Sequence, residues 1–380
     1  MRLRRMLPLC LSLLLLLSAC GSKTADVTPT PPDIPTLPAR TQAPEPSPSP
    51  TATPTETPEP EYTGPRNPLT GEPMEEEWVN KRPVAIMLNN LEQALPQQGQ
   101  SDADIIYECL EEGGITRMMA VYQNPRDAGV IGSVRSTRTY YLELALGHDA
   151  ILIHAGGSDV AGVEDAYGKI RAWGVTSLDG VRGPYMSNTE GGNLMWRDPG
   201  RVKANGYVHS VVTTGAKIDE IFSAASFRQD HKEGWTYQMD FADDGTPAGG
   251  TDAPVITVPF SNYKTGVFTY DQDTGRYLVS EYGDAYIDGN TGEQVGVTNV
   301  VVLRTACRST GDSYGHVSVD LSSGGTGYFA CGGKVIDLVW SKSEPDGQLY
   351  YTDLEGNPIV FGRGKTYVNI VPLNAQVTFE

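Results

Sequence analysis

Cysteine, histidine and phenylalanine are scarce in this chain of 380 residues, which contains five cysteines, five histidines and eight phenylalanines. Beyond the first 20 residues only Cys109, Cys307 and Cys331 remain, and this odd number argues against a disulfide framework. Cys307 and Cys331 can pair only if their strands are adjacent, and Cys109 is expected to be a small core residue. The histidines show neither HxxxH nor HExxH spacing, so we predict no metal site and no cofactor.

Lysine and arginine are also few relative to aspartate and glutamate. The chain has 29 Lys and Arg residues against 47 Asp and Glu residues, which gives a formal net charge of -18. A body this acidic is not expected to bind nucleic acid through its net charge, nor to lie on an anionic membrane surface by electrostatic attraction. Any cluster of arginines in such a chain therefore requires an explanation.

No apolar run in the sequence reaches the roughly 20 residues of a transmembrane helix. The longest, at positions 6–17, follows a basic start and ends in Leu-Ser-Ala-Cys-Gly at positions 17–21. This pattern is typical of a lipoprotein signal peptide, so we predict that residues 1–19 are removed and that Cys20 carries the acyl chains (palmitate or similar). An ordinary signal peptide cut near Ala19, with Cys20 incidental, is the alternative. The chain is expected to be extracytoplasmic and anchored by lipid to the outer face of the cytoplasmic membrane.

Residues 20–66 have the composition of a stalk. Nearly half of the 27 prolines fall here, among Thr, Ser and Glu, and Tyr62 is the only aromatic residue. Such a segment buries too little apolar area to offset the entropy of ordering, and its alternating prolines favour extended polyproline II. We expect a disordered spacer that lifts the body above the membrane.

The remaining residues predict a mixed α/β body in two parts. In residues 67–240, apolar runs alternate with segments of helical periodicity, which indicates an N-terminal domain of α/β layers. The predicted strands are residues 82–88, 104–108, 117–122 and 149–154, and the predicted helices are residues 137–146, 158–170 and 214–225. Residues 241–254 are predicted to be a linker. Short strand-like runs with hairpin turns then favour a smaller β-rich domain at residues 255–380.

Two loops of the first domain carry candidate ligand-binding residues. Each is predicted to lead from a strand into a helix, and in an α/β sheet such loops lie together at the edge where ligands bind. Paired glycines expose backbone N–H groups to an anion, and arginines add forked donors for carboxylate or phosphate. The candidate residues are Arg117, Arg135, Arg138, His154, Gly156, Gly157, Ser158, Arg197 and Asp198.

Three functions fit these residues. The leading hypothesis is non-catalytic binding of an anionic cell-wall ligand, or of an envelope partner protein, through the N-terminal domain. The alternative is a hydrolase that modifies the cell wall with His154, Ser158 or an Asp/Glu pair, although no GxSxG motif is present. A structural adaptor is the third, and it is favoured if the arginines pair with nearby acids and the glycines only form a turn.

Several of these motifs resemble one bacterial family. The matching segments are Asn67-Pro68-Leu69-Thr70-Gly71, residues 82–90 (RPVAIMLNN), residues 101–108, residues 112–117, Arg135-Ser136-x-Arg138, residues 154–158, Trp196-Arg197-Asp198, Gly325-x-Gly327-x-Phe329, Trp340-x-Lys342 and Gly364-Lys365-Thr366. In these the chain resembles the YerB-like lipoproteins, which carry a domain of unknown function numbered 3048. The resemblance implies a mixed α/β N-terminal domain and a smaller C-terminal one, and it implies no particular reaction. Relatives tend to have Pro-His-Asn where this chain has Ala204-Asn205-Gly206, so His209 is the only histidine left in that region.

Overall fold

The computed structural model describes residues 62–380. The predicted signal peptide, Cys20 and nearly all of the predicted stalk lie outside the described residues. No helix within residues 62–380 is both long enough and apolar enough to cross a membrane.

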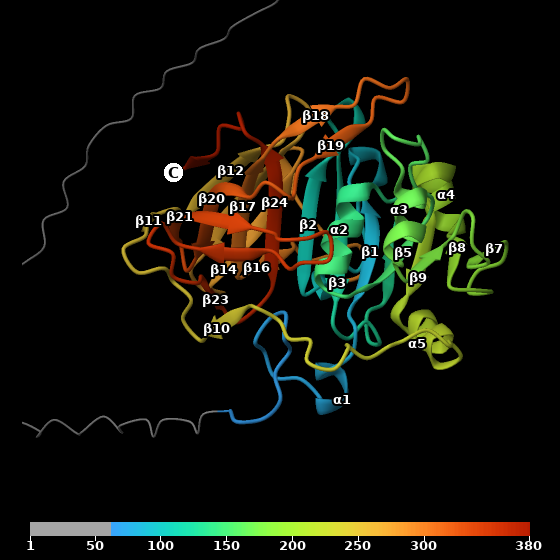
Figure 1. Cartoon of the computed structure of the whole chain (residues 1–380), viewed down its shortest axis with the longest axis horizontal. Coiled ribbons are helices and arrows are strands. Elements are labelled where there is room, and N and C mark those ends of the chain that lie inside the picture. The colour runs from blue at the N-terminus through green and yellow to red at the C-terminus, as the bar shows by residue number, and fades with distance from the viewer. Residues whose placement is uncertain (1–61) are drawn as a thin grey trace, which may run out of the picture. The chain divides into compact units, whose positions relative to one another are not determined.

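A mixed sheet of eleven strands runs through the body (Figure 1). Ten strands follow one another in the order β11, β21, β20, β17, β24, β2, β3, β1, β5, β6, and β22 adds to β21. Their bounds are β11 Thr251–Asp252, β21 Lys334–Ser341, β20 Gly325–Cys331, β17 Asn299–Thr305, β24 Thr366–Pro372, β2 Ile105–Leu110, β3 Thr116–Tyr122, β1 Val84–Asn89, β5 Ile151–His154, β6 Ser177–Asp179 and β22 Tyr350–Thr352. All four strands predicted in the first part are present, within three residues of their predicted bounds.

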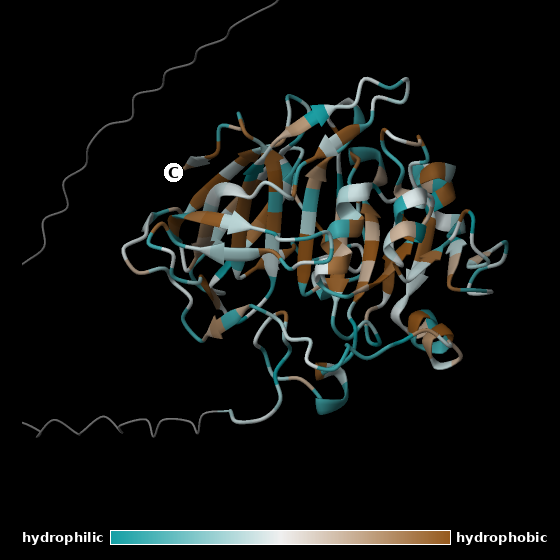
Figure 2. Ribbon diagram, viewed as in Figure 1, coloured by the Kyte–Doolittle hydropathy of each residue, from teal (hydrophilic) through white to brown (hydrophobic). Residues whose placement is uncertain are grey.

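The central strands are buried on both faces, which explains their unbroken apolar sequences. Every residue of β1 is buried, and Figure 2 shows hydrophobic residues along most strands of this sheet. Alternate residues of β1 point into two different cores: Ile86 and Leu88 into one, Ala85 and Met87 into the other. This division follows from the two-residue period of a strand.

A second sheet closes the first of these cores. It contains six strands in the order β15, β14, β13, β12, β25, with β16 paired to β14. Their bounds are β15 Asp284–Ala285, β14 Arg276–Glu281, β13 Thr265–Asp271, β12 Val255–Pro259, β25 Thr378–Phe379 and β16 Gly296–Val297. Ile256, Val258 and Phe268 of this sheet belong to the same core as Ile86 and Leu88 of β1. The body is therefore a sheet packed on a sheet along this face.

Helix α2, Thr139–Gly147, covers the opposite face (Figure 1). Its residues Tyr140, Tyr141 and Leu144 are buried in the core that contains Met87. The helix matches the prediction for residues 137–146 because its apolar side chains recur at helical spacing. The prediction of mixed α/β architecture is confirmed.

The other elements lie around these layers. A four-stranded sheet, β4-β9-β8-β7, holds the loops around Arg135 and Arg197, and two short pairs, β10-β23 and β18-β19, complete the strands. The remaining bounds are β4 Val130–Gly132, β7 Met186–Ser187, β8 Met195–Arg197, β9 Val211–Thr214, β10 Asp240–Ala242, β18 Cys307–Ser309, β19 Val317–Val319, β23 Val360–Gly362, α1 Glu76–Val79, α3 Ala166–Trp173, α4 Pro199–Asn205, α5 Gly215–Ser223, η1 Glu92–Ala94, η2 Gln100–Asp102, η3 Glu112–Gly114 and η4 Tyr207–His209.

The prediction of a helix at residues 158–170 is wrong in its start. Helix α3 begins only at Ala166, and the side chain of Asp165 caps it by accepting a hydrogen bond from the Gly168 N–H. The preceding residues form a turn closed by hydrogen bonds between Val160 and Glu164. Capping by Asp165 is a strong local signal that overrides the apolar spacing upstream of it.

The two predicted domains share one sheet. Strand β24, from the second, runs parallel to β2, from the first, with Tyr107 opposite Val368. Contacts group residues 61–380 as one compact unit. The segment 241–254, predicted as a linker, includes the end of β10 and the whole of β11. The two parts are therefore halves of a common scaffold, and a local sequence pattern cannot show how distant strands pair.

The three cysteines of residues 62–380 are all free thiols. Cys331 ends β20 in the central sheet, whereas Cys307 begins β18, which pairs only with β19 in that part of the chain. The condition for a Cys307–Cys331 disulfide, that the two strands be adjacent, is not met.

The N-terminus of α5 provides a first test of this fold. Thr214 caps the helix through a hydrogen bond from the Lys217 N–H to its hydroxyl, 3.2 Å long. We expect Thr214→Ala to lower the free energy of unfolding by about 1 kcal/mol, because the N–H loses its partner. Urea denaturation measures this change, and Thr214→Ser should restore most of the loss. An unchanged midpoint in Thr214→Ala would show that the cap does not stabilise the protein.

Candidate functional site

The two loops predicted to bind a ligand lie side by side. The Ala155 N–H donates to the Arg135 carbonyl over 3.0 Å, and the Thr137 N–H donates to the Gly156 carbonyl over 2.9 Å. The loop after β4 is therefore bonded to the loop after β5 at its backbone. This adjacency is what the strand-to-helix pattern predicted.

The glycine-containing turn already holds carboxylates of the protein itself. The Gly156 N–H donates to Asp179 over 2.9 Å. The Ser158 hydroxyl and the Thr139 N–H at the start of α2 both donate to Glu164, over 2.9 and 2.7 Å. Asp179 and Glu164 thus occupy the positions that an external anion would take. Gly156, Gly157 and Ser158 are accounted for as a structural turn.

His154 is part of the core beneath this turn. Its ring is fully buried, with Nδ1 2.7 Å from the Gly156 carbonyl oxygen and Nε2 2.6 Å from the Ser177 hydroxyl oxygen. A carbonyl oxygen only accepts, so Nδ1 carries the proton and Nε2 accepts from Ser177. Burial lowers the pKa of His154, which favours the neutral ring. Both ring nitrogens bond to groups other than Ser158, so the arrangement gives no support to a His154–Ser158 catalytic pair.

Arg117 and Arg138 pair with local acids. Glu111 lies 3.0 Å from Arg117 and 3.3 Å from Arg138, and Glu112 lies 2.7 Å from Arg138. Burial raises the pKa of Glu111 to about 7, although the two arginines lower it. These arginines serve mainly to neutralise the acidic turn between β2 and β3.

Arg135 and Arg197 differ from the other two arginines. Within residues 62–380 neither forms a salt bridge. Arg135 donates to the Val208 carbonyl over 2.9 Å, and Arg197 donates to the Tyr207 carbonyl while its guanidinium lies 3.6 Å from the centre of the Tyr207 ring. Burial lowers the pKa of Arg135 to about 10, and the charge of Arg117 lowers it further. Two cations thus meet at one loop with only neutral protein partners.

The loop that they hold is exposed. Tyr207 and Val208 of η4 are 64% and 54% exposed. We call Arg135, Arg197, Tyr207 and Val208 the arginine–tyrosine patch. Both arginines are among the predicted ligand residues. Tyr207 and Val208 are not, because nothing in their spacing distinguishes an exposed loop from a short core segment.

Residues behind the patch fix its position. Asp198, a predicted ligand residue, caps α4 by accepting from the Arg201 N–H over 2.6 Å. The Arg201 guanidinium donates to the His209 carbonyl over 3.1 Å and to the Ala94 carbonyl over 2.6 Å. His209 is buried, and its Nδ1 lies 2.8 Å from the side-chain nitrogen of Asn89. Asp198 and His209 therefore support the patch from below.

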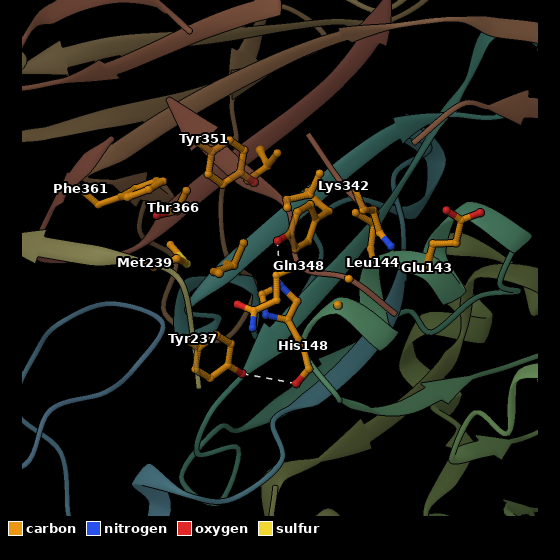
Figure 3. Close-up of a pocket in the computed structure, with 16 residues that line it drawn as sticks. Glu143, Leu144, His148, Tyr237, Met239, Lys342, Gln348, Tyr351, Phe361 and Thr366 are labelled. Carbon is orange, nitrogen blue, oxygen red and sulfur yellow. Dashed lines mark hydrogen bonds between the residues drawn. The ribbon is translucent and has the colours of Figure 1, made fainter. Parts of the chain in front are cut away.

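A small cavity that no sequence motif predicts lies where the two halves meet (Figure 3). Its volume is about 20 Å³, and its lining includes His148 and Tyr237 from one half and Gln348 from the other. The Tyr107 hydroxyl lies 2.7 Å from His148 Nε2, and burial lowers the pKa of His148 to about 4. A space of this size holds about one water molecule. The cavity is therefore a packing gap where the two halves of the chain meet.

A buried charge cluster was also missed. Lys264 is fully buried, with Nζ 2.8 Å from Glu281 and 3.3 Å from Glu108. Asn90 donates to Glu108 over 2.8 Å, and Tyr367 donates to it over 2.6 Å. The carboxylates of Glu108 and Glu281 are both fully enclosed. A glycan chain cannot reach them, so they are not the carboxylate pair that a wall hydrolase would need.

No three His, Cys, Asp or Glu side chains within residues 62–380 are grouped so that they would hold a metal ion.

Comparisons with known proteins agree with this architecture. Residues 69–228 match the family described as "Protein of unknown function (DUF3048) N-terminal domain", and residues 256–368 match its C-terminal domain. The chain is 31% identical over 309 residues to YerB of Bacillus subtilis (strain 168), which is named as a lipoprotein; the match covers 80% of this chain and 86% of YerB. The crystal structure of the YerB protein from Bacillus subtilis is similar with a TM-score of 0.69 at 28% identity, covering 82% of this chain and 99% of that one.

Proposed function

Because this chain belongs to the YerB-like lipoprotein family, we propose that it is a lipid-anchored envelope protein that binds an anionic cell-wall ligand at the arginine–tyrosine patch. The acyl chains on Cys20 would hold it to the outer face of the cytoplasmic membrane. The proline-rich segment would set its reach into the wall. Binding without catalysis is the function that the patch supports best.

The observation that carries this proposal is the pair of cations without acidic partners. The chain carries a formal net charge of -18, yet Arg135 and Arg197 contact backbone carbonyls, whereas Arg117 and Arg138 beside them contact carboxylates. Each guanidinium has five N–H donors, and Arg135 Nε is buried without a hydrogen-bond partner among the described residues. A phosphate or carboxylate at the patch would accept hydrogen bonds from the guanidinium N–H groups that face solvent.

Tyr207 adds a flat surface to this charge. Its ring already stacks on Arg197 and is largely exposed, so it holds the guanidinium plane in place while remaining accessible. Arginine and tyrosine together are the side chains most enriched where proteins make their strongest contacts. The exposed Val208 beside them widens the contact surface.

The double variant Arg135→Ala/Arg197→Ala tests the proposal. A hydrogen bond to a charged group contributes about 1.5–3 kcal/mol, so loss of both arginines should weaken binding at least about tenfold. Binding is measured by co-sedimentation of the purified protein with insoluble cell walls and by calorimetry with poly(glycerol phosphate). Affinity should also fall as salt is raised, since the contacts are exposed.

Arg182→Ala is a matched control. Arg182 also lies over a tyrosine ring, 3.9 Å from the centre of Tyr167, but it is paired with Asp159. This control should bind like the native protein. Equal binding by the double variant and the native protein would overturn the proposal. If walls fail to bind and cross-linking from the patch captures an envelope protein instead, the partner-protein hypothesis replaces it.

A further inference from the structure

A second, larger cavity lies near the junction of the two halves, in a different place from the arginine–tyrosine patch. Its volume is about 320 Å³, at the lower end of the roughly 300–1,000 Å³ typical of small-molecule sites. Residues of both halves line it, including Asp149 and Arg228 from the first half and Asp346 from the second. Leu146 and Asp149 flank the Gly147–His148 pair that lines the smaller cavity of Figure 3.

Two tryptophans supply aromatic surface to this cavity. Trp173 ends α3, and Trp235 lies in the segment that follows α5; both line the cavity and both are partly exposed. The Trp235 ring is stacked on His231 with a centroid distance of 3.8 Å and an angle of 8°. The Tyr237 ring lies nearly perpendicular to the Trp235 ring, with a distance of 4.4 Å between the ring centroids. Trp235 is therefore held rigidly, so a ligand that stacks on it would not have to order it first.

Polar groups of both signs share the same space. Arg228 holds Asp149 with two hydrogen bonds of 2.6 Å, and His231 Nδ1 lies 3.1 Å from the same carboxylate. Asp149 has φ of 51°, an uncommon conformation for a residue other than glycine, so its backbone is held in place against a steric cost. These contacts keep the pKa of Asp149 well below its usual range, mainly through Arg228 and despite burial.

Charge in the cavity is nearly balanced. Arg82, Arg228 and Lys232 line it with positive charge, while Asp149 and Asp346 supply negative charge. A strongly charged ligand would meet repulsion from one set as well as attraction to the other. A ligand with many hydroxyl groups can use both, because hydroxyls donate to carboxylates and accept from guanidinium and ammonium groups.

We propose that this cavity binds a neutral pyranose sugar unit, which stacks its apolar C–H face on Trp173 or Trp235 and hydrogen-bonds its hydroxyls to Asp149 and Arg228. The sugar combines an apolar face with a polar rim, which matches two indoles surrounded by balanced charges. The site is separate from the arginine–tyrosine patch and does not depend on it. It would give the protein a second contact with a glycan-containing surface.

Tryptophan fluorescence tests this directly, since two of the five tryptophans of the chain line the cavity. The purified protein is titrated with a tetramer of N-acetylglucosamine and, separately, with a tetramer of glucose. We expect a saturable change in emission with at least one of them. At least one of Trp173→Ala and Trp235→Ala should weaken binding about tenfold, in line with the loss of one stacking contact.

Two further variants keep the test independent of folding. Lys232 also lines the cavity and is exposed, so Lys232→Ala leaves the packing intact and removes one charged donor to a sugar hydroxyl. Loss of that hydrogen bond should weaken binding about tenfold. Arg135→Ala/Arg197→Ala should leave sugar binding unchanged, which separates this site from the proposed wall-ligand site. Absence of a saturable change with both sugars, or native affinity in Lys232→Ala and in both folded tryptophan variants, would overturn the proposal.

Discussion

Replacement of Lys264 by alanine should lower the free energy of unfolding by about 3–5 kcal/mol, the cost typical of breaking a buried ion pair. The Lys264 side chain is fully buried between Glu281, 2.8 Å away, and Glu108, 3.3 Å away. Without the ammonium group two carboxyl groups would remain enclosed without a cation. They would then have to bind protons or draw in water. Urea denaturation of the native and variant proteins measures the difference.

Two variants define what the result means. Lys203→Ala removes an exposed lysine from α4 and should change the unfolding free energy by less than about 0.5 kcal/mol. The triple variant Lys264→Met/Glu108→Gln/Glu281→Gln removes the charges together and should recover much of the loss. If Lys264→Ala unfolds at the same urea concentration as Lys203→Ala, the cluster does not hold the fold together.

The cluster matters because it links the two halves of the chain. Glu108 lies on β2 of the first half, whereas Lys264 and Glu281 come from the hairpins of the six-stranded sheet. Tyr367 of β24 donates to Glu108 over 2.6 Å and to Glu281 over 3.2 Å. Charges at this junction fix the relative position of the two sheets, since an apolar contact alone would tolerate sliding.

Local patterns in the sequence predicted the elements but not their partners. The run at residues 82–88 predicted β1 because a strand buried on both faces needs an unbroken apolar sequence. The spacing of Tyr140, Tyr141 and Leu144 predicted α2. The pairing of β2 with β24 joins residues more than 250 positions apart, and no local period records it. Local patterns therefore predict single elements, while the sheet that joins the two halves cannot be predicted from them.

The candidate site shows the same limit. Arg117 and its partner Glu111 lie six residues apart across one turn, so their pairing is visible in the sequence in hindsight. Asp179, which accepts from the Gly156 N–H, carries no such signal because it ends β6, 23 residues further along the chain. Lys264 follows a Ser-Asn-Tyr turn and has the local sequence of an exposed hairpin lysine. Only the assembled fold distinguishes a paired arginine from an unpaired one.

The second large prediction concerns pH. Burial raises the pKa of Glu281 to about 7, although Lys264 lowers it, and the charge of Glu108 raises it further. A carboxyl group with a raised pKa in the folded state stabilises the protein fully below its unfolded pKa of about 4.5, and this stabilisation is lost as the pH rises towards 7. With one bound proton, the two carboxyl groups together carry a single negative charge, which the ammonium group of Lys264 neutralises.

The difference in unfolding free energy between the native protein and Glu281→Gln should therefore decline as the pH rises from about 4.5 to 7, by as much as about 3 kcal/mol at 1.36 kcal/mol per pKa unit. His148 acts in the opposite direction. Burial lowers its pKa to about 4, so its stabilisation is lost as the pH falls from about 6.5 towards 4. Since His148 is present in both proteins, its effect cancels in the difference. Urea denaturation at a series of pH values measures the curve, and a difference that stays flat across this window would show that Glu281 does not hold the extra proton.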